Sequence, residues 1–196
     1  RCRRCELWVS DGTAAGTELV ADLSDGTFTF SSNPLPLSSF GNHLLFTANT
    51  PNFGTELWIS NGTAAATQLV ADLEPGPAGS VASWGVKIRS LYYFRGTTSA
   101  TGTELYVTDG SAAGTHVVAD IVPGPGDSDV GTINALGSSV IFGADDGVTG
   151  TEPWVSDGTA AGTEQLVNIG LPAINASGNP AAKLTFEGRV YFAAND

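Results

Sequence analysis

Short apolar runs alternate with polar, glycine-rich stretches along the whole chain. In the run from Glu56 to Ser60, Glu56 and Trp58 fall on one face and Leu57 and Ile59 on the other, which is the alternation of a β-strand. No stretch sustains the helical period of about 3.6 residues, and Gly or Pro interrupts every candidate helix. The pattern predicts an all-β fold.

The apolar runs belong to a repeat of about fifty residues. The segment that starts at Glu6 and reads ELWVSDGTAAGT returns with small changes at Glu56, Glu104 and Glu152. Each copy reads as four short strands, called a to d in their order within a blade. Four-stranded units with this period predict the blades of a β-propeller. For one blade the expected strands are Leu35–Phe40, Leu44–Ala48, Glu56–Ser60 and Thr67–Asp72.

The strand order predicts how the blades close. Three repeats are whole, residues 6–23 supply strands c and d of the fourth, and residues 181–194 supply its strands a and b. Pairing these halves would remove exposed sheet edges, which invite aggregation. We therefore expect a single domain over residues 1–196, a four-bladed β-propeller of four-stranded antiparallel blades, with residues 1–5 as an N-terminal tail. The alternative is a slice of a longer array of such repeats.

Glu-Leu-Trp followed by Ser-Asp-Gly-Thr, in four copies, resembles the bacterial ELWxxDGT repeat family. The departures are Tyr106 for Trp, Asn61 for Asp and Pro153 for Leu. The resemblance covers nearly the whole chain and implies β-propeller-type repeats of secreted or surface-associated proteins, with no catalytic residues to carry over. The turn is also similar to the Asp-box of sialidase propellers, where that motif is structural.

A residue present in every blade is expected to build the blade, whereas a residue that departs in one blade is a better candidate for function. The recurring acid or amide before Gly is expected to accept backbone hydrogen bonds while Gly takes a positive φ; the other interpretation, a metal loop, needs several oxygen ligands. The recurring aromatic is expected to pack between blades, with sugar stacking second, and the recurring Glu to make a structural hydrogen bond. These three sets are Asp11, Asn61, Asp109 and Asp157; Trp8, Trp58, Tyr106 and Trp154; and Glu6, Glu56, Glu104 and Glu152.

Sequence variation between repeats concentrates in two sets of loops. Both sets are expected on one face of the disc, and loops on a rigid scaffold are where binding usually evolves. The d-to-a loops are 24–34, 74–81, 122–130 and 170–180, and the b-to-c loops are 49–55, 96–103 and 143–151. The candidate ligand-binding residues are Trp84, which has no counterpart in the other blades, and the internal arginines Arg89 and Arg95.

Four acids form a candidate calcium site. Asp127 and Asp129 lie in a d-to-a loop, and Asp145 and Asp146 lie in the b-to-c loop of the blade that this loop enters. If both loops share a face, four carboxylates converge, and calcium binds six to eight such oxygens. The alternative is a solvated acidic rim, because charge runs are usually surface.

Composition excludes some function classes. A net charge of −12 should repel nucleic acid and anionic membrane surfaces, and no apolar run approaches the roughly 18 residues of a membrane span. Catalysis finds little support, because His43 and His116 occupy non-equivalent places, although plentiful acids leave a glycosidase carboxylate pair open. Cys2 and Cys5 form a C-x-x-C pair that can be a terminal disulfide, part of a loose tail, a redox pair or half a zinc site.

The sequence therefore predicts a secreted or surface-associated, non-enzymatic module that binds a glycan, matrix component or protein through its loop face. The alternative is an architectural repeat that assembles with itself. A glycoside-acting enzyme ranks behind both.

Overall fold

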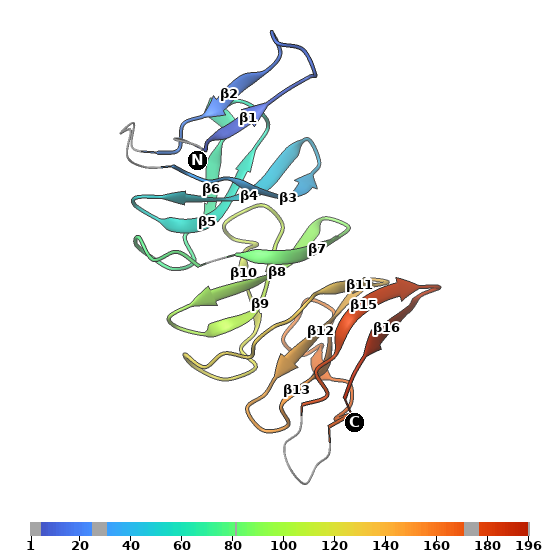
Figure 1. Cartoon of the computed structure of the whole chain (residues 1–196). Coiled ribbons are helices and arrows are strands. Elements are labelled where there is room, and N and C mark those ends of the chain that lie inside the picture. Colours follow the sequence, from blue (N-terminus) through green and yellow to red (C-terminus); the bar gives the residue numbers. More distant parts are fainter. Residues whose placement is uncertain (1–4, 25–30, 81, 171–176, 196) are drawn as a thin grey trace. The chain divides into compact units, whose positions relative to one another are not determined.

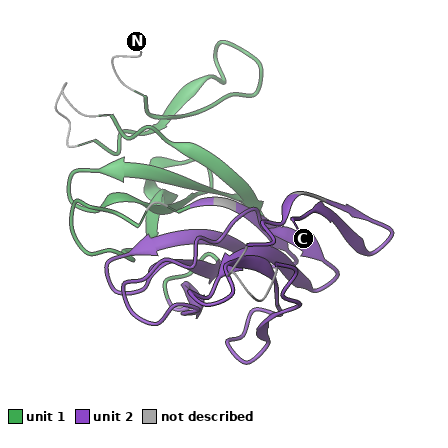
Figure 2. Ribbon diagram, turned by 60° about the horizontal axis from the view of Figure 1, so that its bottom comes forward, with its two compact units in different colours: residues 1–82, 110–112 green, residues 83–109, 113–196 purple. Residues whose placement is uncertain are grey.

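The computed structural model describes residues 5–24, 31–80, 82–170 and 177–195. These residues hold sixteen β-strands, a short 3-10 turn at Ala64–Ala66 and no α-helix (Figure 1). The named strands pair antiparallel throughout, so the expected all-β class is confirmed. The chain divides into two compact units, residues 1–82 with 110–112 and residues 83–109 with 113–196 (Figure 2).

Unit 1 contains one hairpin and one four-stranded sheet. The hairpin is β1 (Leu7–Val9) and β2 (Glu18–Ala21), and the sheet has the order β3 (Leu35–Phe40), β4 (His43–Thr50), β5 (Gly54–Ser60) and β6 (Gln68–Ala71). The four strands of this sheet lie where the sequence pattern predicts them.

Unit 2 contains two four-stranded sheets and a second hairpin. The sheets are β7 (Ser83–Ile88), β8 (Leu91–Thr98), β9 (Gly102–Thr108) and β10 (His116–Ala119), then β11 (Asn134–Leu136), β12 (Ser139–Asp145), β13 (Thr151–Ser156) and β14 (Thr163–Gln165). The hairpin is β15 (Ala181–Phe186) and β16 (Arg189–Ala193). Strand β11 contacts both β7 and β15, and the Thr185 hydroxyl donates to the Ala135 carbonyl at 3.0 Å.

The core of unit 1 lies between the hairpin and the sheet. Leu7 and Val20 of the hairpin cluster with Phe46 and Trp58 of the sheet. Trp58 is 8% exposed, so its predicted packing between repeats is confirmed. Trp8, at the same repeat position, is 60% exposed, because β1 pairs with β2 alone among the described strands and lacks the sheet that shields Trp58.

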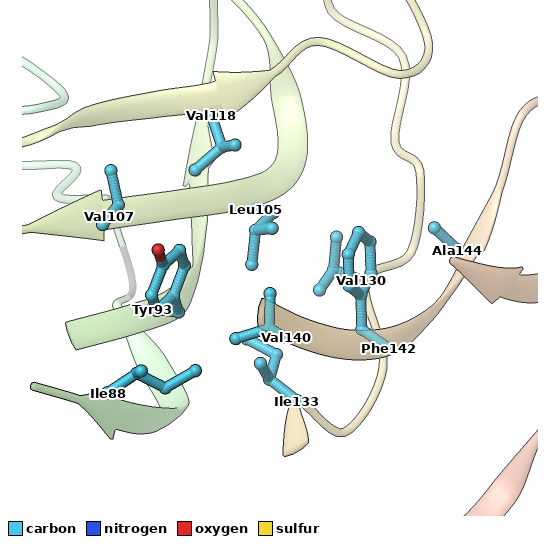
Figure 3. Close-up of a cluster of buried hydrophobic side chains, with 10 residues drawn as sticks. All are labelled: Ile88, Tyr93, Leu105, Val107, Val118, Val130, Ile133, Val140, Phe142 and Ala144. Atoms are coloured by element: carbon cyan, nitrogen blue, oxygen red, sulfur yellow. The ribbon is translucent and has the colours of Figure 1, made fainter. Parts of the chain in front are cut away.

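The core of unit 2 lies between its two sheets (Figure 3). Tyr93 and Leu105 of one sheet meet Val140 and Phe142 of the next, and each is nearly or fully buried. Trp154 packs against this core. Removing one such side chain from water stabilises the fold by roughly 1.5–3 kcal/mol, so facing apolar strand surfaces hold successive repeats together.

The c-to-d turns form as predicted. The Asp11 carboxylate accepts hydrogen bonds from the amide and the hydroxyl of Thr13 at 2.8 and 2.7 Å, and Gly12 has φ of 90°. Asp157 makes the same pair of bonds to Thr159 at 2.9 and 2.7 Å. These acids are parts of the turn, as the repeat pattern indicates.

One strand differs from the prediction. In the last repeat the apolar stretch that follows the turn runs on to Asn168, so the repeat pattern predicts a longer strand d, whereas β14 ends at Gln165. The Leu166 amide donates to the Pro153 carbonyl at 2.8 Å, so the backbone of Pro153 faces strand d. Since Pro has no N–H, it cannot return a hydrogen bond, and the ladder stops there.

The sheets match the repeats. Three four-stranded sheets correspond to the three whole repeats, and the hairpins β1–β2 and β15–β16 correspond to the two predicted half blades. The four-bladed ring that would unite them stays a prediction.

Candidate functional site

Buried glutamates at the start of the c strands hold the d-to-a loops. Glu56 is fully buried and accepts hydrogen bonds from the amides of Glu74 and Ser80 at 3.1 and 2.9 Å. The Ser80 hydroxyl adds a bond of 2.6 Å. Both donors lie in the d-to-a loop that follows the sheet. One carboxylate in strand c therefore binds that loop at two points.

The other repeats use the same connection. Glu104 is fully buried and accepts bonds from the Val122 amide at 3.3 Å and the Ser128 hydroxyl at 2.7 Å. Glu6 accepts the amides of Leu23 and Ser32, both at 3.3 Å. The predicted structural hydrogen bond is confirmed, and its partner is a loop distant in sequence.

In the last repeat the hydroxyl donor is replaced. Glu152 accepts the amides of Ile169, Gly170 and Gly178 at 2.9, 3.1 and 3.0 Å. Gly178 stands where the other loops carry a Ser, so a backbone amide takes over from the side chain. The glutamate of the last repeat therefore still binds its d-to-a loop, but through backbone amides and without a serine hydroxyl.

Burial raises the pKa of two of these carboxyls, although hydrogen bonds from Ser80 and Ser128 oppose the effect. The pKa of Glu56 rises, and that of Glu104 rises to about 7. Raised carboxyl pKa values also mark catalytic acids. Here the carboxyls have no solvent exposure and bind their own loops, which favours a structural role.

The two loop sets meet on one face within each unit. The Asn49 amide donates to the Ser32 carbonyl at 2.8 Å in unit 1, and the Asp145 amide donates to the Ser128 carbonyl at 2.8 Å in unit 2. Each bond joins a b-to-c loop to a d-to-a loop. These described loops therefore lie side by side within each unit, while the shared face of a disc stays a prediction.

A pocket of about 410 Å³ opens between two such loops in unit 1. It lies between the segment after β2 and the loop joining β4 to β5, and we call it the loop-face pocket. Its lining includes Asp22, Ser24, Thr50, Asn52, Phe53 and Trp58.

Polar groups surround the aromatic part of the loop-face pocket. Asp22 and Asn52 are exposed, and Asp22 accepts the Ser24 amide at 3.1 Å. The indole N–H of Trp58 is buried and has no hydrogen-bond partner among the described residues, whereas that of Trp154 donates to the Ala144 carbonyl at 3.1 Å. Aromatic surface with a few convergent polar groups is typical of a small-ligand site. Sequence reasoning identified these loops and gave sugar stacking as a second interpretation of Trp58, but it did not identify Asn52 or Phe53.

Arg89 and Arg95, two of the predicted ligand-binding residues, line different pockets. Arg95 of β8 lines a pocket of about 200 Å³ with Val130. Arg89 lies in the a-to-b turn between β7 and β8, at the opposite end of the sheet from the b-to-c loop, and lines a different pocket. The backbone of Trp84 lies in β7, and its side chain is outside the described part of the structure.

Two of the predicted calcium ligands lie beside a strand start. Asp127 accepts the Thr103 amide at 2.7 Å and so caps the beginning of β9. Asp129 has a left-handed φ of 48° in the same loop. The hydrogen bond from the Thr103 amide is reason enough for an Asp at position 127.

The other two predicted ligands shape the loop after β12. Asp145 accepts the Gly147 amide at 2.7 Å, and Asp146 accepts the amides of Val148 and Thr149 at 2.8 and 2.7 Å. Within the described residues, no group of three or more His, Cys, Asp and Glu side chains could hold a metal ion. The calcium site stays a prediction.

Comparisons with protein-family models, curated proteins and solved structures gave no match, so the geometry carries the functional argument. Among the described residues, no helix is long and apolar enough to cross a membrane. Cys2 lies outside the described residues, and the interpretation of the C-x-x-C pair stays open.

Proposed function

We propose that this chain is a non-enzymatic recognition module that binds a neutral glycan in the loop-face pocket. The observation that carries the proposal is the pocket itself, in which Trp58 and Phe53 lie beside the polar groups of Asp22 and Asn52. A sugar offers an apolar ring face and hydroxyls, and these two kinds of surface suit them. The net charge of −12 disfavours polyanionic glycans.

The loop connections support binding at a preformed site. Glu6 and Glu56 hold the loops that precede and follow the β3–β6 sheet, and the Asn49 amide joins the pocket's b-to-c loop to the loop before β3. A site that is ordered before binding loses less conformational entropy when the ligand arrives. Such preorganisation is what a recognition surface needs.

The acid content of the pocket favours binding over hydrolysis. Glycoside hydrolysis ordinarily needs two carboxyl groups on opposite sides of the scissile bond. Asp22 is the one acidic residue among the described residues that line the loop-face pocket. The secreted or surface location belongs to the same proposal and rests on the resemblance to the ELWxxDGT repeats.

The module is proposed to be a four-bladed propeller in which β16 pairs with β1. Tyr191 is 52% exposed, whereas Leu45 at the same blade position is fully buried, and Trp8 and Trp58 differ in the same way. The half blades thus expose side chains that whole blades bury. The contacts of β11 with β7 and β15 also fit first strands gathered around an axis.

Binding to neutral oligosaccharides tests the proposal. We expect a glycan array to identify a neutral ligand, and Asn52→Ala and Phe53→Ala each to weaken its binding by about tenfold in calorimetry, or about 1.4 kcal/mol. Asn42→Ala, an exposed amide in the a-to-b turn of the same sheet, is the matched control and should bind normally. Equal affinity of the Asn52, Phe53 and Asn42 variants would contradict the proposal, as would an array without neutral ligands.

Self-assembly is the second candidate, and the exposed half-blade hairpins favour it. If β16 of one copy pairs with β1 of another, the same apolar positions are buried between molecules. Light scattering that shows concentration-dependent growth of the particle would support assembly, and a monomer across micromolar to millimolar concentrations would exclude it.

A further inference from the structure

Arg89 stands at a turn position that favours glycine. Its φ is 55°, and the equivalent a-to-b turn residues are Gly41 at 60°, Gly137 at 64° and Glu187 at 48°. A residue with a Cβ costs roughly 1–2 kcal/mol in the left-handed region. Since two repeats use Gly here, the turn does not need an arginine. An arginine at this position has a backbone cost that glycine would avoid, so its side chain is a candidate for a role in function.

Arg89 borders a pocket of about 400 Å³ within unit 2, which we call the turn-face pocket. The pocket lies between the a-to-b turns and the c-to-d turn of neighbouring sheets, at the end opposite the b-to-c loops. Its lining includes Arg89, Ser90, Leu91, Tyr93, Ser138 and Asp157. The cavity is therefore lined by one positively charged side chain, several hydroxyl groups and apolar surface.

The guanidinium of Arg89 is available to a ligand. Arg89 is exposed and makes no hydrogen bond or ion pair with any other described residue. Asp157, the acid in the pocket lining, instead accepts two bonds from Thr159. These bonds lower the pKa of Asp157, which keeps its carboxylate ionised. The five N–H donors of the Arg89 guanidinium thus have no partner among the residues that the structure describes.

We propose that the turn-face pocket binds a sugar acid, with Arg89 pairing with the carboxylate of a uronic acid residue. A planar guanidinium matches a carboxylate through two parallel hydrogen bonds. The hydroxyls of Ser90 and Ser138 suit sugar hydroxyls, and Leu91 supplies apolar surface. Asp157 and the net charge of −12 repel dense polyanions, so the ligand is an otherwise neutral glycan with isolated carboxylates.

The probes are a xylo-oligosaccharide that carries one glucuronic acid and the same molecule with its carboxyl group reduced to an alcohol. We expect calorimetry to show at least tenfold tighter binding of the acid form by the unmodified chain. Equal affinity for the two forms, or no binding of the acid form, would overturn the proposal.

Arg89→Gly tests the residue without disturbing the turn. Because glycine suits a φ of 55°, the melting temperature should stay the same or rise while the preference for the acid form disappears. Arg189→Gln removes one exposed positive charge elsewhere and should keep that preference. Retention of the preference by Arg89→Gly, or its equal loss in Arg189→Gln, would assign the effect to general charge and refute the site.

The proposals for the two pockets can be refuted independently of each other. The turn-face proposal does not rest on the loop-face function, because it concerns other residues in the other unit. Asn52→Ala should leave binding of the acid probe unchanged, and Arg89→Gly should leave binding of neutral glycans unchanged. Loss of acid-probe binding in Asn52→Ala would place the carboxylate in the loop-face pocket and overturn the turn-face site.

Discussion

At the scale of single residues, the fully buried glutamates combine opposing effects. Burial penalises the ionised carboxyl, while amide and hydroxyl donors from the following loop stabilise it. For Glu104 the burial penalty is the larger effect, and its pKa rises from 4.5 to about 7. A group built to hold a loop therefore also makes stability depend on pH.

The first prediction concerns that dependence. Because the folded pKa of Glu104 lies above its unfolded value of 4.5, its contribution to stability is complete below pH 4.5 and is lost as pH rises through about 7. The full loss is on the order of 3 kcal/mol. Urea unfolding from pH 4.5 to 8 should show a smaller decline for Glu104→Gln than for the unmodified chain.

Glu164 provides the control for this experiment. It is an exposed acid of β14, in the other four-stranded sheet of the same unit, so Glu164→Gln should leave the decline with pH unchanged. If Glu104→Gln and the unmodified chain lose stability in parallel, the burial penalty at Glu104 is absent.

At the scale of elements, the c-to-d turns of two repeats differ at two positions and also differ in local geometry. Gly162 follows Asp157 in one turn, and a Cβ at Gly162 would collide with that carboxylate. The turn of the second repeat carries Asn61 and Ala66 instead, and there the chain forms a 3-10 turn at Ala64–Ala66. Glycine therefore suits position 162 because the Asp157 carboxylate occupies the space that a Cβ would need.

The second prediction follows from this difference. Gly162→Ala should destabilise the protein by about 1–2 kcal/mol, because the carboxylate of Asp157 must move and weaken its bonds to Thr159. Thermal melting measures the effect. Ala66→Gly, the reverse change, should cost less, about 0.5–1 kcal/mol of backbone entropy. A larger loss for Ala66→Gly than for Gly162→Ala would show that the collision is not the cause.

At the scale of the whole molecule, the two half blades decide between a ring and an assembly. The register of β4 with β5 pairs Leu45 with Ile59, and the same blade positions are Tyr191 in β16 and Val9 in β1. Both Tyr191 and Val9 are exposed in the separate hairpins. Their pairing would complete the fourth blade.

The third prediction is that Tyr191→Cys with Val9→Cys forms a disulfide within one molecule, in a chain whose Cys2 and Cys5 are changed to Ser. Opposed strand positions have the Cα separation that a disulfide needs. Non-reducing gel filtration should show an oxidised monomer, more stable by about 2–4 kcal/mol. Disulfide-linked multimers would instead support assembly between copies, and a chain that remains reduced would refute both pairings.

The sequence by itself determined what depends on neighbours along the chain. Alternation located strands such as Glu56–Ser60, the repeated apolar stretches located strands such as Leu35–Phe40, and the Asp-Gly-Thr turn was recognisable because Asp11 bonds Thr13, two residues away. Repetition separated scaffold from variable residues and placed the two loop sets on one face. Trp58 was assigned to the core on the same reasoning. These features have local causes, so pattern and spacing were sufficient.

The tertiary structure decided what depends on partners far apart in sequence. Ser80 lies 24 residues after Glu56, so a repeated Glu could not reveal which loop it holds. Trp8 and Trp58 share a motif and differ in exposure, because burial depends on which strands lie alongside. Likewise, Asn52 and Trp58 meet in one pocket only after the sheet folds, and Arg89 emerges at the other end of its sheet. Strand pairing and side-chain packing, which spacing does not encode, determine these outcomes.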